Sequence, residues 1–185
     1  MAKSVLKVIC LSGVVAGLAA TAVYAANPTV GGAPMFESKN IVENAVNSPV
    51  HTTLVAAVTA AGLVDTLASS GPFTVFAPTN SAFGKLPAGT VDTLLEPANK
   101  GQLTKVLTAH VVSGNISAGQ LLGRAKAAGG KYRMKTVSGD TITAIANGKG
   151  VAIVDESGGT SVITTADVNQ SNGVIHVVNK VLLPK

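Results

Sequence analysis

The sequence changes its pattern once, near Tyr132, and this change limits the fold more than any other feature. Before it, apolar residues recur at helical spacing, as Leu54, Val55 and Val58 do. After it come short β-rich runs such as "DTITAIAN", "VAIVD" and "GVIHVVNKVLL", separated by glycine-containing turns such as "GKG" and "ESGG". Helices followed by strands predict an α+β domain whose late strands form an antiparallel meander or sandwich.

One strand is expected outside the strand-rich half, in the stretch "PFTVFAPTNSAF". Residues 73–77 alternate between two faces, and Pro78 ends the strand because proline cannot donate a backbone hydrogen bond. Thr79 or Asn80 then caps a short helix. The turn has no glycine that would let backbone amides converge on a phosphate, so a phosphate loop is excluded. We expect this strand to pair with the late strands, and the apolar run "GVIHVVNKVLL" to lie centrally in the sheet.

Residues 1–25 have the pattern of a secretory signal peptide. Lys3 and Lys7 precede an apolar run that is shorter than the ~20 residues of a spanning helix, and the segment ends on small residues. We expect a secreted or periplasmic protein with no stable membrane insertion after cleavage; an uncleaved anchor is the alternative. Residues 26–38 hold two prolines and a Gly-Gly pair and are expected to form a flexible leader, followed by one folded domain at 39–185.

Composition excludes several classes of function. Cys10 is the single cysteine and lies in the signal peptide, so the exported domain can have neither a disulfide nor thiol chemistry. The net charge falls from +5 to +3 when Lys3 and Lys7 leave, which is too small to imply a nucleic-acid partner. There is no tryptophan, and Tyr132 is the one tyrosine left after cleavage, so a stacking platform for single-stranded nucleic acid is missing.

The sequence offers little to a catalytic or metal site. His51, His110 and His176 are far apart and lack the spacing of helical or strand metal motifs. The run "GNISAG" has the wrong spacing for a nucleophile elbow, and Ser117 is better interpreted as the cap of the helix that follows. We therefore predict a non-enzymatic protein without catalytic residues, cofactor or metal. An enzyme would require the three histidines or several carboxylates to meet in one cleft.

Five basic residues occur in "RAKAAGGKYRMK" with no acidic residue among them. They are Arg124, Lys126, Lys131, Arg133 and Lys135. Together they suggest contact with a polyanion, either an anionic polysaccharide or membrane headgroups. The alternative is a solvated loop leading into an edge strand, where lysine discourages edge-to-edge aggregation.

Three segments together resemble the hallmark segments of the fasciclin-type domain family: "GPFTVFAPTNSAF", "LTKVLTAHVVSGNISAGQLL" and "GVIHVVNKVLLP", in that order and spacing. The resemblance covers essentially 39–185, and the leader is similar to that of single-domain bacterial secreted members. It implies a wedge-shaped β-sandwich of mainly antiparallel strands with several helices packed along one side. It also implies an adhesion and interaction module without catalysis, and this inference is by fold analogy.

The same resemblance identifies family-motif residues. The matching positions are Thr79, Asn80, His110, His176 and Asn179. It implies that they are mostly structural and satisfy backbone groups where helices meet the sheet, since buried polar groups need partners. Two departures matter: Ala109 stands where many animal members have the tyrosine of an adhesion-associated Tyr-His pair, and Asn179 stands where the motif often has aspartate.

Two hypotheses about function follow. The first is an exported, monomeric adhesion or interaction module that binds a surface or matrix protein, another protein partner or an anionic polysaccharide, with no nucleic acid and no cofactor. The second is an extracytoplasmic carrier or sensor that holds a small apolar ligand between its helices and its sheet. A substantial apolar pocket would favour the second hypothesis, and a tightly filled core would exclude it.

Overall fold

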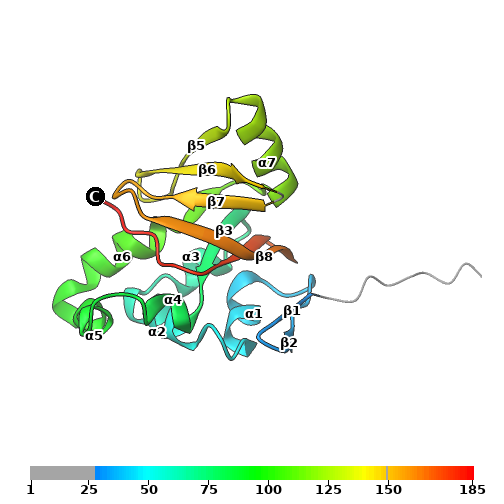
Figure 1. Cartoon of the computed structure of the whole chain (residues 1–185). Helices are drawn as coiled ribbons and strands as arrows, with labels where there is room; N and C mark the ends of the chain where they lie inside the picture. Colours follow the sequence, from blue (N-terminus) through cyan, green and yellow to red (C-terminus); the bar gives the residue numbers. More distant parts are fainter. Residues whose placement is uncertain (1–27, 149) are drawn as a thin grey trace, which may run out of the picture.

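The computed structural model describes residues 28–148 and 150–185 and is drawn in Figure 1; the expected signal peptide at 1–25 lies outside them. In chain order the elements are β1 (Thr29–Val30), β2 (Ala33–Pro34), α1 (Ile41–Asn47), α2 (Thr52–Ala61), α3 (Val64–Ala68), β3 (Phe73–Pro78), α4 (Asn80–Phe83), α5 (Thr90–Leu95), the 3-10 helix η1 (Pro97–Asn99), α6 (Lys100–Thr108), β4 (Val111–Ser113), α7 (Ala118–Ala127), β5 (Lys131–Lys135), β6 (Thr141–Asn147), β7 (Gly150–Val154), β8 (Thr160–Gln170) and β9 (Gly173–Val178). None of the described helices combines the length and apolarity that crossing a membrane requires.

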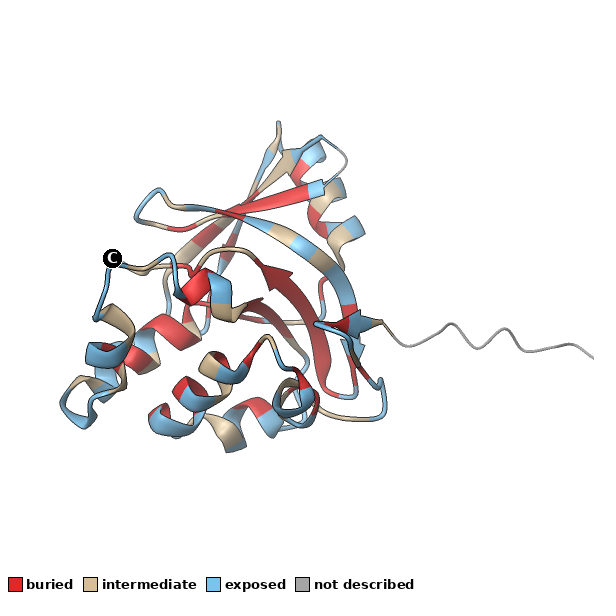
Figure 2. Ribbon diagram, turned by 60° about the horizontal axis from the view of Figure 1, so that its bottom comes forward, coloured by how far each residue is buried: buried red, intermediate tan, exposed pale blue. Residues whose placement is uncertain are grey.

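Within the described residues, seven strands form one sheet in the order β4-β3-β9-β8-β7-β6-β5. Neighbouring strands are antiparallel except β3 and β9, which run parallel with Phe73 opposite Gly173 and Pro78 opposite Val178. The expected pairing of the early strand with the late ones is confirmed, and β9 lies centrally and is buried along its whole length. Figure 2 shows the strands at the centre of the molecule almost entirely buried.

The β3–β9 pair separates two hydrophobic cores, because alternate residues of a strand face opposite sides. On one face, Val75 and Ile175 belong to the core that α1 to α6 complete. On the other face, Phe76 and Val178 belong to the core formed with α7 and strands β5 to β7. Figure 1 shows this division, with α1, α2, α4 and α5 below the sheet and α7 beside β5 and β6 above it.

The expected sandwich is built by bending one sheet along β8. The first residues of β8 pair with β7, and the remainder pairs with β9. Between Ile163 and Val168 the register shifts twice, and such irregularities bend a strand and increase its twist. The bend brings β5 to β7 over the face of β3 and β9 that carries Phe76 and Val178. The expected α+β sandwich with helices along one side is therefore confirmed.

The segment expected to be a flexible leader packs against the domain instead, which corrects that prediction for residues 28–38. Gly31 and Gly32 both have positive φ and connect β1 to β2 as a two-residue hairpin turn. Val30 and Met35 flank this turn and are only 5% and 2% exposed in the helix-side core. The Gly-Gly pair is therefore a hairpin turn between two core residues.

Candidate functional site

The first family motif joins the end of β3 to the start of α2. Thr79 caps α4, since its hydroxyl accepts a hydrogen bond from the Ala82 N–H at 3.3 Å. Asn80 Oδ1 accepts the Thr53 N–H at 3.0 Å, and its Nδ2 donates to Thr52 Oγ1 at 2.9 Å. Helix α2 has no side-chain cap from the residue that precedes it, so Asn80 supplies this cap from another part of the chain.

The middle motif places His110 between α6 and the C-terminal segment. Its Nδ1–H donates to the Val106 carbonyl at 2.8 Å, and its Nε2 accepts the Leu182 N–H at 2.9 Å. These partners fix one neutral tautomer, because a carbonyl only accepts and an N–H only donates. Burial lowers the pKa of His110 to about 4, against smaller opposing effects of the Val106 carbonyl and the Asp155 carboxylate. The ring has no free nitrogen with which to bind a metal or move a proton.

The last motif connects β9 to its neighbours. His176 Nε2–H donates to the Ile116 carbonyl at 2.9 Å, and its Nδ1 accepts the Asp167 N–H at 3.2 Å. Burial lowers the pKa of His176, and the Ile116 carbonyl and the Asp167 carboxylate oppose this effect. Asn179 Oδ1 accepts the Val162 N–H at 2.9 Å, which extends the pairing of β9 with β8. The His176 ring and the Asn179 side-chain oxygen therefore both bond to neighbouring backbone groups.

The five basic residues of the segment 124–135 lie on two elements, helix α7 and strand β5, which is the edge strand of the sheet. Lys131, Arg133 and Lys135 alternate along β5 and so share its outer face; we call these three the basic edge. Arg124 lies on the side covered by α7, because its guanidinium donates to the Tyr132 hydroxyl at 2.8 Å and lies 5.4 Å from the centre of that ring. All five side chains are exposed: Arg124, Lys126, Lys131, Arg133 and Lys135.

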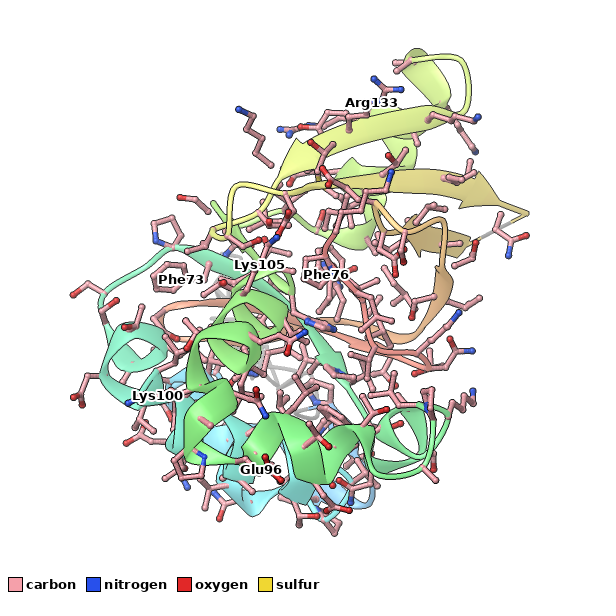
Figure 3. All side chains as sticks on the ribbon, turned by 90° about the vertical axis from the view of Figure 1, so that its left-hand side faces the viewer. Phe73, Phe76, Glu96, Lys100, Lys105 and Arg133 are labelled. Carbon is pink, nitrogen blue, oxygen red and sulfur yellow. The ribbon has the colours of Figure 1, made fainter. Side chains whose placement is uncertain are left out.

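The basic edge lies at the end of the sheet, beside uncharged residues of β6. Its three members stand opposite Ile145, Thr143 and Thr141 in the ladder. In the part of the chain that the structure describes, none of its cations pairs with a carboxylate. Figure 3 shows Arg133 at the outer rim, at the opposite end of the molecule from Glu96.

A cavity of about 160 Å³ lies between α1, α2, α3 and the helix-side face of β3 and β9. Its wall is largely aliphatic, with Ile41, Leu54 and Val58 from the helices and Val75 and Ile175 from the strands. Its polar side chains are Ser48, His51, Thr59 and His110, and none of the described residues that line it is charged. The substantial apolar pocket that the carrier hypothesis requires is present.

The three histidines do not meet in one place. His51 and His110 both line the cavity, whereas His176 lies on the other face of the sheet with Phe76, whose ring centre is 5.6 Å away. Within residues 28–148 and 150–185, no three His, Cys, Asp or Glu side chains are arranged to hold a metal ion. His110 and His176 each use both ring nitrogens in hydrogen bonds to backbone groups.

Local sequence pattern does not predict that His51 lines a cavity. His51 is 3% exposed, and its Nδ1 lies 2.9 Å from Ser48 Oγ. It occupies the N-cap position of α2 but does not cap the helix. Ser, Thr, Asp or Asn is usual at this position, so a histidine here was the available sequence signal that the side chain has another role. The elements that enclose it come from both ends of the domain, so local pattern does not reveal the cavity.

Comparison with known proteins agrees with this geometry. The family model of the fasciclin domain matches residues 49–184. The uncharacterized protein sll1735 of Synechocystis is 43% identical over 147 residues, covering 78% of this chain and 97% of that protein. The immunogenic protein MPB70 of Mycobacterium bovis is 36% identical over 166 residues, covering 86% of this chain and 77% of the relative.

A solved structure shares the fold. The FAS1 domain pair of the insect cell adhesion molecule Fasciclin I superimposes with a TM-score of 0.69 at 17% identity. The match covers 78% of this chain and 51% of that one, so this chain spans about half of the domain pair. The sequence motifs, the sheet order and these matches lead to one conclusion: the chain belongs to the fasciclin domain family.

Proposed function

We propose that the protein is an exported, non-enzymatic adhesion module that binds an anionic surface polysaccharide through the basic edge. The observation that carries this proposal is the row of three exposed cations on one face of an edge strand, none of which pairs with a carboxylate among the described residues. The signal-like segment at 1–25 supports export. Two names are consistent with the proposal: Fasciclin I is described as a cell adhesion molecule, and MPB83 of Mycobacterium bovis, 34% identical, as a cell surface glycolipoprotein.

The spacing of the basic edge suits a linear polyanion. Residues two apart on a strand are separated by roughly 7 Å, so the three charges form a row of roughly 14 Å. Each contact with a sulfate or carboxylate would be weak in water, and a repeating chain compensates by offering several such contacts at once. The uncharged Thr143 and Ile145 beside the row can contact sugar rings between the charged groups.

The competing explanation is that these cations only protect the edge of the sheet from pairing with other chains. Binding to dextran sulfate, measured by biolayer interferometry with neutral dextran as reference, separates the two explanations. We expect the protein to bind dextran sulfate and to lose most of that binding between about 0.05 M and 0.5 M salt, because screening shortens the range of the charges.

A matched pair of variants tests the location. The variant K131E/R133E/K135E should weaken binding by about tenfold or more, whereas K39E/K100E/K185E, with the same change in net charge, should change it by less than about threefold. Equal losses in both variants would show that net charge alone causes the binding. Absence of binding by the unmodified protein would leave edge protection as the role of the three residues.

The cavity favours a second candidate function, a carrier or sensor of a small apolar ligand. Its largely apolar wall with a few polar groups is typical of a binding site, and a tightly filled core would leave no space of about 160 Å³. Native mass spectrometry of protein purified from its source should then reveal a co-purifying small molecule. Protein that is ligand-free after gentle purification, and that gains no stability from apolar extracts of its source, would argue against this function.

A further inference from the structure

The cavity contains one polar atom that the protein leaves unpaired. His51 lines the cavity, and its Nε2 is buried without a hydrogen-bond partner among the described residues. Burial lowers the pKa of His51; the nearby Ala77 carbonyl opposes this effect but forms no hydrogen bond of acceptable geometry with Nε2. Buried polar atoms of this kind are rare, because folding has removed their hydrogen bond to water.

The other polar side chains of the wall already have partners. His110 uses both ring nitrogens, as described above. Thr59 Oγ1 donates to the Val55 carbonyl at 2.9 Å, and Ser48 Oγ is bonded to His51 Nδ1. His51 Nε2 is therefore the one buried side-chain nitrogen or oxygen of the described wall that has no hydrogen-bond partner.

Water is a poor occupant of this space. A buried water molecule normally needs two to four polar partners, and the described wall offers one side-chain atom without a partner, His51 Nε2. An engineered apolar cavity of about 150 Å³ stays dry and binds benzene, and the present cavity of about 160 Å³ is of similar size. The volume thus fits a molecule with one six-membered ring.

The ligand must be neutral, and a hydroxyl is the polar group that fits best. A charged group would be buried here without a counter-charge, which proteins avoid. If Ser48 donates to His51 Nδ1, then Nε2 carries a proton and donates; if Nδ1–H donates to Ser48, then Nε2 accepts. A hydroxyl can accept in the first case and donate in the second, whereas a ketone or an ether suits only the first.

The cavity is accessible from solvent. Val46 at the end of α1 belongs to its wall, yet its side chain is 59% exposed. Thr59, on the facing helix α2, is also both exposed and part of the wall. A ligand can therefore enter between α1 and α2 without disturbing the sheet.

We propose that this cavity binds a neutral, ring-sized molecule whose single hydroxyl group hydrogen-bonds to His51 Nε2. The proposal rests on the carrier or sensor function given above as the second candidate, and names the chemistry of its ligand. It is independent of the basic edge, which lies in the other half of the sheet and is built around the other core.

Three probes separate the elements of the proposal. Phenol has the ring and the hydroxyl, benzene has the ring alone, and benzoate carries a charge at pH 7.5. Dissociation constants would be measured by ¹H–¹⁵N NMR titration of the protein. We expect phenol and benzene to bind and benzoate not to bind. If neither phenol nor benzene binds, both the carrier function and this inference fail; if benzoate binds as well as phenol, the requirement for a neutral ligand fails.

The role of His51 is tested by replacing both members of its hydrogen-bonded pair. In the variant S48A/H51F both polar groups become apolar, so no new buried group is left unpaired. The ratio of the benzene to the phenol dissociation constant should be about fivefold to tenfold larger in the unmodified protein than in this variant. Equal ratios would overturn the hydrogen bond to Nε2 while leaving an apolar carrier function intact.

The location is tested by filling the space. Val58→Phe should abolish binding of phenol and benzene, whereas the same change at the exposed Val162→Phe should have no effect. Intermolecular NOEs from the phenol ring to the methyl groups of Leu54 and Val58 provide the same information without a variant, should Val58→Phe fail to fold. NOEs to other residues, or unchanged binding in folded Val58→Phe, would place the ligand elsewhere and overturn the proposal.

Discussion

Lowering the pH from 7.5 to 5 should reduce the free energy of unfolding by about 2 kcal/mol through His110 alone. In the fold, Val106 and Leu182 hold this ring in its neutral form, and burial lowers its pKa from 6.5 to about 4. Between these two values the unfolded chain binds more protons than the folded one, so stability rises with pH. The contribution is fully present above about pH 6.5 and is lost as the pH falls toward 4.

The magnitude follows from the two pKa values. At pH 5 the imidazole is about 97% protonated in the unfolded chain and about 9% protonated in the fold. Integration of this difference from pH 7.5 to pH 5 gives a decrease in the free energy of unfolding of about 2 kcal/mol. Below pH 4 the decrease approaches its limit of about 3 kcal/mol. The pKa values of His51 and His176 are lowered as well, so the total loss should exceed the share of His110.

Urea unfolding followed by far-UV circular dichroism between pH 7.5 and pH 5 measures this effect, and at these pH values most carboxylates remain ionised. The variant His110→Gln is the control, because glutamine does not titrate and the contribution of about 2 kcal/mol should disappear from its pH dependence. Equal pH dependence of the two proteins would refute the argument. So would an NMR titration in which the His110 ring of the folded protein protonates near pH 6.5.

Three further substitutions, one of them with a matched control, test the architecture. Asn80→Ala should lower the free energy of unfolding by about 1 to 2 kcal/mol, seen as a lower urea midpoint, because α2 loses its cap. Thr74→Val should cost about 1 to 3 kcal/mol in a thermal melt, since its buried hydroxyl bonds two backbone groups before α7, at 2.6 and 2.9 Å. Gly173→Ala, with φ +158°, should cost about 3 kcal/mol or more because its Cβ would overlap the Phe73 carbonyl, whereas Gly123→Ala in exposed helix should stabilise by about 0.5 to 1 kcal/mol. A neutral Gly173→Ala would contradict the close approach of β3 and β9.

The centre of the fold could be predicted from sequence because local pattern and tertiary environment agree there. The alternation of residues 73–77 assigns Val75 to one core and Phe76 to the other, as the structure shows. The apolar final run predicted a central strand, because only a strand covered on both faces can be apolar on both. Ser117 caps α7 as expected, with a capping box that Gln120 completes.

The sites were less predictable, because they depend on the spaces and faces that packing creates. Two cations of the basic segment, Arg124 and Lys126, lie on α7, and a one-dimensional count of charge cannot separate them from the three on β5. The composition of the "VGGAPM" run is that of a linker and predicts a leader, and only the burial of Val30 and Met35 reveals the hairpin. The cavity around His51 has walls from segments as distant as Val30 and Ile175, and no local pattern records a gap between them.

The two proposed sites should act independently of each other. The cavity belongs to the helix-side core, and the basic edge belongs to the strands that enclose the other core, with β3 and β9 between them. Sites without shared partners usually contribute additively, and a ligand changes a distant equilibrium only if it binds two conformations differently. Saturating phenol should therefore change the dissociation constant for dextran sulfate by less than about twofold. A larger change, absent in the variant Val58→Phe, would show that the β3–β9 pair transmits a conformational change from the cavity to the edge of the sheet, and the protein would then be a sensor rather than a carrier.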